Sequence, residues 1–354
     1  MFKLSILIPS LTLLISISLL ILLAPRILPN HQITISLPDE LDDLSLFNKA
    51  IAAETTFPKR SSHKNKLRLG TIKVHQPKIA FMFLTNSDLH FSPLWENFFN
   101  GSDPHLYNIY VHDDPYIKIP PLKGVFKDRL IPSKRTQRSS PTLISAARRL
   151  LAYAMIDDPT NLYFALISQH CIPLHSFSYM YRFLLDARRL SRNMEFPSYI
   201  EILDHSDSLF DRYNARGDNV MLPEVKFMDF RVGSQFFVLT RRHSLMVIKD
   251  RKLWRKFRKP CINVESCYPE EHYFPTLLSM EDLNGCSKYT LTNVNWTDSV
   301  DGHPHTYHPY EVSSKLIYDL RESNSTYSYM FARKFSPDCL KPLMELADSV
   351  IFKD

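Results

Sequence analysis

The chain has 354 residues, of which 44% are hydrophobic and 23% charged, and these proportions are those of a globular protein rather than a disordered one. Its net charge of +6 is small for this length, and 37 acidic residues are mixed with the 43 basic ones, which argues against a nucleic-acid-binding protein. Only 7 glycines accompany 24 prolines, and neither GxGxxG nor GxxxxGK[ST] occurs, so a glycine-rich phosphate loop is excluded.

An uncharged apolar run occupies residues 4–24, directly after Lys3. At about 1.5 Å per residue, a helix of this length crosses a bilayer core of about 30 Å. A cleaved signal peptide is the alternative, but its apolar region usually has about 7–15 residues, and the sequence after this run is a poor cleavage site. We therefore expect a transmembrane signal anchor over 4–24, after a cytoplasmic tail of residues 1–3.

Charges and glycosylation sequons indicate how this anchor is oriented. The α-amino group and Lys3 precede the run, and Arg26 follows it before a group of acidic residues. This small positive excess favours a single-pass type II membrane protein with a lumenal body. Three N-x-[ST] sequons, at Asn100, Asn295 and Asn324, agree with a lumenal, glycosylated body.

The cysteines are compatible with an oxidising lumen, because they allow at most two internal disulfides and leave one thiol over. They are Cys171, Cys261, Cys267, Cys286 and Cys339. No CxxC pair occurs, so a zinc ribbon is excluded. His303, His305 and His308 raise a zinc site as an alternative, but their loop is rigid and no acid or cysteine is spaced to complete the site. A serine hydrolase is a weaker alternative, because no GxSxG motif occurs.

A change in composition at residue 78 divides the rest of the chain. Residues 25–77 lack a sustained apolar period and contain a basic stretch from Lys59 to Lys73, which predicts a solvated lumenal stem. From residue 78 onward, short apolar runs alternate with helical patterns, and no further boundary is evident. We expect one folded domain over residues 78–354.

The apolar runs of this domain predict an α/β fold. Strands are expected at 79–85, 107–112 and 162–168, with a helix at 141–156 between the second and the third. A further strand at 234–240 and a basic helix at about 242–258 are expected in the second half. Alternation of this kind predicts a mainly parallel central sheet flanked by helices on both faces.

The carboxyl ends of the three predicted strands are the first candidate site. Ligands of α/β sheets bind beyond these ends. The polar segments 85–88, 112–114 and 168–170 follow the strands, so we expect ligand contacts from them.

A second candidate is a pair of acids, Glu270 and Glu271, that lies among the aromatic residues Tyr268, Tyr273 and Phe274. Desolvation by aromatic neighbours can raise the pKa of a carboxylate and make it a usable general base. The alternative is that the two acids only begin a helix, where negative charge is favoured. Composition and spacing leave both interpretations open.

An ordered series of short motifs extends over residues 78–345. It comprises FMFLT (81–85), YVHDDP (110–115), AARRLLAYAMIDDP (146–159), LISQHCIPL (166–174), SYIEI (198–202), DRYN (211–214), FRVGSQFFVLTR (230–241), CYPEEHYFPTLL (267–278), LTNVNWTD (291–298), HPHTY (303–307) and FARKFSPDCL (331–340). In this series the chain resembles the Core-2/I-branching β-1,6-N-acetylglucosaminyltransferase family, and within it the plant brittle-culm-like branch. The resemblance implies a GT-A-type glycosyltransferase domain over 78–354 that transfers a sugar from a UDP donor with inversion.

The resemblance also implies roles for single residues on the donor side. Glu271, in the PEEH segment, matches the catalytic base that removes the proton of the acceptor hydroxyl. Lys334 matches the diphosphate-binding lysine, and Arg321 is the candidate for the accompanying arginine, with an ordinary surface residue as the alternative. Asp113 matches the nucleotide-contacting acid, although its sequence also suits an exposed turn. Thr85, at the end of the first strand, is a further expected donor contact.

On the acceptor side, the resemblance implies contacts from Glu201, Arg231 and Trp296. Trp296 would stack on a sugar face, and a core aromatic is the alternative. Gln169 and the residues at 236–237 depart from the usual pattern of close relatives. These departures leave the identity of the acceptor open.

No D-x-D motif occurs, although most GT-A enzymes hold a divalent metal through one. Fixed cations can neutralise a diphosphate instead of a metal. We therefore expect a metal-independent enzyme that needs no cofactor besides its UDP-sugar substrate.

Together, these features predict a Golgi type II membrane glycosyltransferase that moves an N-acetylglucosamine- or glucuronic-acid-type sugar onto a glycan or glycoprotein, such as one of the cell wall. The expected partners are the UDP-sugar, this acceptor and the lipid bilayer through residues 4–24, and no nucleic acid. The alternative from another class is a catalytically inactive lumenal protein that binds glycans or scaffolds other enzymes.

Overall fold

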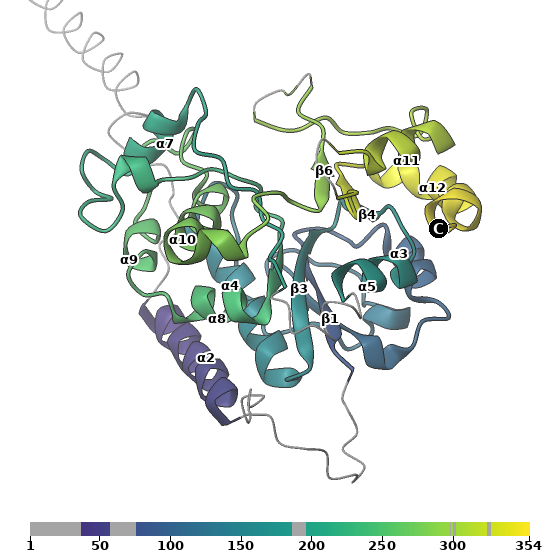
Figure 1. Ribbon diagram of the computed structural model, residues 1–354, viewed down its shortest axis with the longest axis horizontal. Helices are drawn as coiled ribbons and strands as arrows, with labels where there is room; N and C mark the ends of the chain where they lie inside the picture. Colours follow the sequence, from purple (N-terminus) through teal and green to yellow (C-terminus); the bar gives the residue numbers. More distant parts are fainter. Residues whose placement is uncertain (1–36, 57–75, 186–195, 298, 300–301, 324–326) are drawn as a thin grey trace, which may run out of the picture. The chain divides into compact units, whose positions relative to one another are not determined.

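The computed structural model describes residues 37–56, 76–185, 196–297, 299, 302–323 and 327–354 (Figure 1). The expected anchor at 4–24 lies outside these residues. Within the described part of the chain, no helix combines the length and the apolar character that a membrane span requires.

A four-stranded sheet forms the centre of the fold, in the order β2-β1-β3-β5. Its strands are β1 (Lys78–Leu84), β2 (Tyr107–His112), β3 (Asn161–Ser168) and β5 (Val238–Thr240). β1 pairs in parallel with both β2 and β3, whereas β5 is antiparallel to β3. The prediction of a mainly parallel sheet is therefore confirmed, and the mixed α/β arrangement fits a GT-A-type fold.

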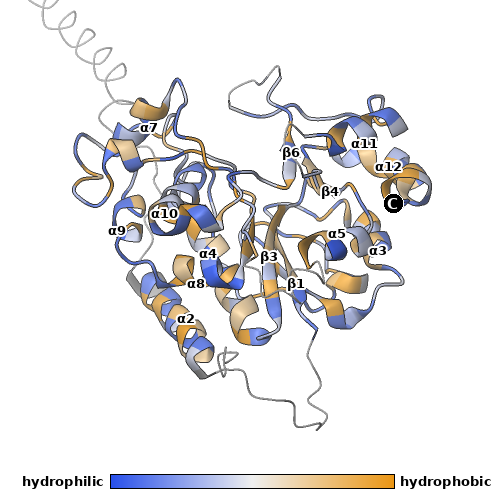
Figure 2. Ribbon diagram, viewed as in Figure 1, coloured by the Kyte–Doolittle hydropathy of each residue, from blue (hydrophilic) through white to orange (hydrophobic). Residues whose placement is uncertain are grey.

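Side chains of β1 alternate between two hydrophobic cores, as the two-residue period of a strand requires. Ile79, Phe81 and Phe83 belong to one core, whereas Ala80, Met82 and Leu84 belong to the other. Both faces of the central strand are therefore buried, and Figure 2 shows hydrophobic residues along β1 and β3. The strand reads in sequence as a continuous apolar run because it has no solvent-facing side.

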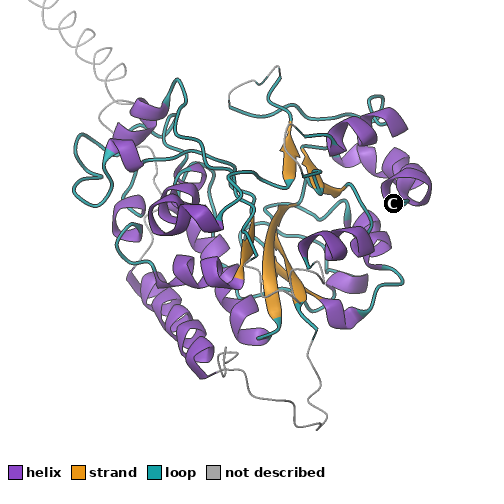
Figure 3. Ribbon diagram, viewed as in Figure 1, coloured by secondary structure: helices purple, strands orange, loops and turns teal. Residues whose placement is uncertain are grey.

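Helices cover both faces of this sheet (Figure 3). The core of Ile79 includes residues of α3 (Ser92–Phe99), α5 (Phe177–Leu184) and α12 (Leu340–Leu346), whereas the core of Ala80 includes residues of α4 (Pro141–Asp157), α8 (Arg241–Lys249) and α10 (Tyr273–Asp282). Shorter elements are η1 (Pro104–Leu106), η2 (Gly124–Phe126), α7 (Leu209–Asn214), η3 (Phe227–Asp229), α9 (Trp254–Phe257), η4 (Pro269–Glu271), η5 (Leu283–Gly285), α11 (Ser314–Arg321), η6 (Pro337–Cys339) and η7 (Ala347–Ile351).

α4 begins where its sequence predicts. Ser140 is the N-cap residue, and its hydroxyl oxygen accepts a hydrogen bond from the backbone N–H of Thr142 at 3.1 Å. Pro141 occupies the first turn, where the missing N–H has no helical partner to lose. The cap and the proline together fix the loop that precedes α4, which contributes to the candidate site below.

α2 (Leu37–Thr56) is the main departure from the predicted organisation, because a helix of 20 residues lies within the expected stem of 25–77. It packs on α4 and α8, and Phe47 and Ala50 are buried in the same core as those helices (Figure 1). α2 is therefore part of the folded domain rather than of a solvated stem.

The predicted helix at 242–258 is divided in two at Asp250, which ends α8. The Asp250 carboxylate accepts backbone N–H bonds from Lys252, Leu253 and Trp254. These bonds start α9, because a short carboxylate satisfies the first donors of a helix.

A second, three-stranded sheet has the order β4-β7-β6, formed by β4 (Ile172–Pro173), β7 (Phe331–Arg333) and β6 (Thr292–Val294). β7 leads directly into Lys334. The backbone N–H of Phe335 donates to the carbonyl of His170 at 3.2 Å. This bond places Lys334 close to the segment that follows β3.

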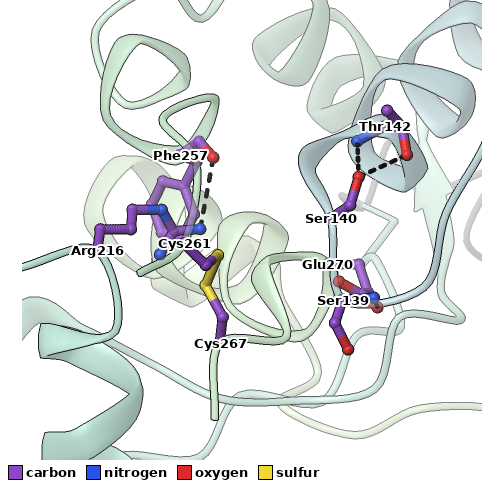
Figure 4. The surroundings of a disulfide bond; sticks show 8 residues. All are labelled: Ser139, Ser140, Thr142, Arg216, Phe257, Cys261, Cys267 and Glu270. Atoms are coloured by element: carbon purple, nitrogen blue, oxygen red, sulfur yellow. Dashed lines mark hydrogen bonds between the residues drawn. A yellow bond between two sulfur atoms is a disulfide. The ribbon is translucent and has the colours of Figure 1, made fainter. Parts of the chain in front are cut away.

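One disulfide joins Cys261 to Cys267 (Figure 4). Cys171, Cys286 and Cys339 are free thiols, and all three are buried. The sequence allowed two disulfides, and among the described cysteines the structure forms one.

Candidate active site

The three parallel strands end at the same edge of the central sheet. The Thr85 backbone N–H donates to the carbonyl of His112 at 2.9 Å, which joins the ends of β1 and β2. The Gln169 side-chain amide donates to Asn86 at 2.6 Å, which joins the ends of β1 and β3. All three predicted polar segments are therefore brought together.

Two adjacent acids after β2 differ in what they contact. Asp114 is buried, and its carboxylate accepts bonds from the backbone N–H groups of Tyr116 and Thr136 at 2.9 and 3.0 Å. Asp113 is half-buried, and its carboxylate has no hydrogen-bond or ion-pair partner among the described residues. Asp114 therefore holds the loop, whereas Asp113 is available to a ligand.

Three basic residues, Arg138, Arg333 and Lys334, form a group that we call the cationic cluster. Burial lowers the pKa of Lys334, and the charges of Arg333 and Arg138 lower it further. The pKa of Arg333 is lowered mainly by burial, the charge of Glu271 opposes this shift, and the charge of Arg138 adds to it. No acidic side chain of the described chain pairs with these three cations within 4.0 Å. Positive charge without a direct ion-pair partner attracts an anion.

His170 lies beside the cationic cluster at the end of β3. Burial, followed by the charge of Lys334, lowers its pKa to about 4, so the ring is neutral at pH 7. Its Nδ1 lies 3.3 Å from the carbonyl oxygen of Phe335. His170 therefore adds no charge and fixes the backbone next to Lys334.

Glu271 ends the short helix η4, at the entrance to α10. Its Oε2 lies 2.8 Å from Nη1 of Arg212 in α7, and about a quarter of the Glu271 side chain is exposed. Gly233 donates its backbone N–H to the Glu271 carbonyl at 2.9 Å. The carboxylate is thus fixed in direction and open to solvent, which suits a group that takes a proton from a substrate.

Sequence reasoning did not single out Arg212. Its signal was present, because the residue lies in the DRYN motif at 211–214. The role of the arginine becomes visible only when α7 is placed against η4.

Glu270 has a different environment from Glu271. It is only 4% exposed, and its Oε1 accepts the backbone N–H of Ser139 at 3.0 Å, which ties η4 to the loop before α4 (Figure 4). Burial raises the pKa of Glu270 to about 8, and the charge of Glu271 adds to this effect. Glu270 therefore supports the loop, and Glu271 is the acid that a substrate can reach.

Tyr268 connects the cationic cluster to Glu271. The guanidinium carbon of Arg138 lies 5.5 Å from its ring centroid, and that of Arg212 lies 4.9 Å from it. Both distances are those of cation–π contacts. Tyr268 also has a φ of +35°, an uncommon value for a residue with a side chain. One aromatic ring thus contacts arginines from both parts of the site.

Of the expected acceptor residues, Glu201 lies near Glu271. Burial raises its pKa, and the negative charge of Glu271 adds to this effect. The two residues pack through Gly233, because a Cβ atom at that position would lie 2.1 Å from the Glu201 carbonyl oxygen. Only glycine fits there.

Arg231 and Trp296 differ in how far they are available to an acceptor. Arg231 uses Nη1 to bond the carbonyls of Met228 and Phe230 at 2.6 and 3.0 Å, so it holds the η3 loop. Trp296, two residues after β6, is 53% exposed. This exposure excludes the alternative that Trp296 is a core aromatic.

Two of the residues predicted to contact the donor have structural roles instead. Arg321 donates from Nε to the carbonyl of Leu174 at 2.7 Å and from Nη2 to Val350 and Ile351 at 2.9 and 3.0 Å. These bonds tie α11 to β4 and to the C-terminal turn, so Arg321 is not part of the cationic cluster. The resemblance pointed to an arginine near Lys334, and Arg333 and Arg138 occupy that place instead.

Thr85 is buried, and its hydroxyl bonds the main chain of Ser87 within the same loop. It shapes the end of β1 rather than presenting a hydroxyl to a ligand. Among the sequons, Asn100 is exposed and Asn295 is half-buried, whereas Asn324 lies outside the described residues.

The histidines of the zinc alternative have other partners. His303 lies 2.7 Å from Nη1 of Arg138, and His305 lies 2.8 Å from Glu311. No group of three or more His, Cys, Asp or Glu side chains that could hold a metal occurs in the part of the chain that the structure describes.

A family model described as Core-2/I-branching enzyme matches residues 79–321. The chain belongs to this family. It is also similar to Glycosyltransferase BC10 of Oryza sativa subsp. japonica, with 26% identity over an alignment of 320 residues. The match covers 76% of this chain and 76% of that protein. The resemblance seen in the motifs is therefore confirmed, and this Core-2/I-branching enzyme is a glycosyltransferase.

The matched region of the Core-2/I-branching enzyme contains Asp113, Arg138, Arg212 and Glu271. It begins after α2 and ends before Lys334. Lys334 therefore belongs to the candidate site from outside the matched region.

Proposed function

We propose that this glycosyltransferase moves a sugar from a UDP donor to a hydroxyl group of a glycan or glycoprotein, with inversion at the anomeric carbon. The observation that supports the proposal is the placement of Glu271, which Arg212 fixes, next to the cationic cluster across Tyr268. Displacement at a sugar carbon needs a base on the acceptor side and positive charge on the leaving-group side.

In the proposed reaction, the acceptor hydroxyl gives its proton to the Glu271 carboxylate. The hydroxyl oxygen forms a bond to the anomeric carbon, and the bond from this carbon to the diphosphate oxygen breaks. The electron pair of the broken bond leaves with UDP, and the cationic cluster stabilises the added negative charge. Asp113 contacts the nucleoside.

The donor sugar in this proposal is of the N-acetylglucosamine or glucuronic acid type, and no metal is required. The absence of a D-x-D motif and the three cations that lack a direct ion-pair partner among the described residues support metal independence. We expect activity to persist in EDTA and to remain the same when manganese is added. Loss of activity in EDTA and its recovery with manganese would contradict this part of the proposal.

We also propose that the enzyme is a Golgi type II membrane protein with a lumenal catalytic domain. The uncharged run at 4–24, the charge bias around it and the sequons support this location.

Substitution of the two adjacent glutamates tests the proposed base. Glu271→Gln removes the basic oxygen without changing the size of the side chain, so kcat should fall by roughly 10²–10⁴-fold. Glu270→Gln is the matched control, because a glutamine still accepts the Ser139 N–H bond, and it should leave kcat within about threefold of wild type.

Transfer would be measured with a panel of UDP-sugars and wall-glycan acceptors. Wild-type activity that survives Glu271→Gln would show that the base is a different group. A wild-type protein that neither binds UDP nor uses any UDP-sugar would favour the glycan-binding or scaffold alternative.

A further inference from the structure

The helix α2 carries a buried acid that reaches towards the donor side of the sheet. Asp43 is 7% exposed, and its two carboxylate oxygens lie 2.7 and 2.9 Å from Nε and Nη2 of Arg149 in α4. Arg149 is 4% exposed. Two parallel bonds of this kind fix a guanidinium in both position and direction.

The third guanidinium nitrogen of Arg149, Nη1, lies near His112 at the end of β2. It is 3.4 Å from Nε2 of His112, and the backbone N–H of Lys134 lies 3.4 Å from the same ring nitrogen. The ammonium group of Lys134 also returns to Asp43, at 3.3 Å from Oδ1. Asp43 thus pairs with two basic residues, and each of them also contacts His112: Arg149 through its guanidinium and Lys134 through its backbone N–H.

His112 is fully buried, and it directly precedes Asp113, the proposed nucleotide contact. Burial and the charge of Arg149 lower the pKa of His112 to about 3, so its ring is neutral and accepts at Nε2. The His112 carbonyl also accepts the Thr85 N–H, which fixes the strand end from the other side. The direction of Asp113 therefore depends on how firmly His112 is held.

We propose that α2 contributes to the donor site through Asp43, which is a positioning residue. Asp43 holds Arg149 and Lys134, these two residues hold His112, and His112 in turn fixes the direction of Asp113. This inference rests on the proposed function, because it assumes that Asp113 contacts UDP. The family match begins at residue 79, so α2 adds to the donor site from outside the matched region.

A role in overall stability alone is the competing explanation, and the same helix offers a control. Glu54 Oε2 lies 2.7 Å from Nε of Arg241, so α2 carries a second acid–arginine pair. Arg241 bonds the carbonyls of Met155 and Asp158, near the start of β3. The Glu54 pair is therefore at the end of the sheet opposite to the donor site.

The experiment compares Asp43→Asn and Glu54→Gln in the full chain, solubilised in detergent. Affinity for UDP would be measured by calorimetry, and KM and kcat with the most active UDP-sugar. Asp43→Asn leaves Arg149 beside His112 without its acid and leaves Lys134 with Asp42 alone, at 3.8 Å, so we expect the Kd for UDP and the donor KM to rise about 5- to 20-fold. The value of kcat should stay within about twofold. Glu54→Gln should lower the melting temperature and leave both binding constants unchanged.

Equal UDP affinity in Asp43→Asn and wild type would overturn the inference and leave the proposed function intact. Wild-type protein without affinity for UDP would instead overturn the proposed function, and this inference with it. If Asp43→Asn does not fold, Arg149→Lys replaces it, because a lysine keeps the charge that faces Asp43 but lacks the second branch that reaches His112. Arg149→Lys should raise the Kd for UDP in the same range, and an unchanged Kd would again overturn the inference.

Discussion

Glu270 and Glu271 are neighbours in the sequence, yet the fold gives them opposite environments. η4 turns Glu270 inward to the Ser139 backbone and leaves Glu271 next to Arg212. Burial raises the pKa of Glu270, which is the acid that supports the loop before α4. A raised pKa therefore does not by itself identify the acid of this pair that a substrate can reach.

The titration of Glu270 should appear in the stability of the protein. Its pKa rises from a usual 4.5 to about 8 on folding, so between these values the folded chain binds a proton that the unfolded chain has lost. Stability therefore falls as pH rises through this range. Glu270→Gln should remove this contribution, on the order of a few kcal/mol at pH 8 and close to zero below pH 4.5. Denaturant unfolding of both proteins from pH 4 to 8 measures the difference, and parallel curves would show that Glu270 is ionised in the folded state.

Lys334 is the member of the cationic cluster that the sequence analysis also proposed as a donor contact. Lys334→Gln removes its charge, so the Kd for UDP should rise roughly 10- to 100-fold, the range for loss of a bond to a charged group. Lys341→Gln, at an exposed position of α12, serves as the control and should bind UDP as wild type does. Unchanged UDP affinity in Lys334→Gln would place the diphosphate elsewhere.

Among the helices and strands, the sequence predicts those that short-range patterns encode. β1, β2, β3 and α4 lie within one or two residues of their predicted bounds, because uninterrupted apolar runs and a Ser-Pro cap are local signals. The break at Asp250 was missed because an aspartate in a helical pattern is an ordinary surface residue until its carboxylate bonds the next turn.

α2 was missed for a different physical reason. Its hydrophobic residues in the core are few, with Phe47 and Ala50 buried and Leu46 and Ile51 partly buried, and Asp43 and Glu54 add ion pairs to arginines. Acids that pair with arginines more than a hundred residues away look in the sequence like solvent-facing charges. The cationic cluster was only partly predicted for the same reason, because Arg138 and Arg333 are far apart in the chain.

The extent of the folded unit can be tested with two fragments, one that begins at residue 30 and one that begins at residue 70. The shorter fragment lacks α2, so it loses the ion pair between Asp43 and Arg149 and exposes the part of the core that Phe47 and Ala50 cover. It should show a lower melting temperature or fail to accumulate as soluble protein. Thermal unfolding of the two fragments makes the comparison, and equal melting temperatures would show that α2 is dispensable to the fold.

At the scale of the whole molecule, the site is assembled from segments that no local pattern connects. Asp113 follows β2, Arg138 precedes α4, Arg212 lies in α7, Glu271 ends η4 and Lys334 follows β7. The motifs indicated which segments matter, because their order matches a family. The packing of the complete chain decides which side chains meet in the site. It also decides which side chains hold the fold together instead, as Arg321 does.

The loop closed by Cys261 and Cys267 ends one residue before Tyr268, the ring that contacts arginines from both parts of the site. Closing a loop removes conformations that the chain would otherwise sample. In a reducing compartment this loop is open, so the segment that leads to Glu271 has lost one of its fixed ends. The fraction of protein in which this disulfide has formed depends on the host that produces the enzyme. This fraction therefore has to be known when activities are compared.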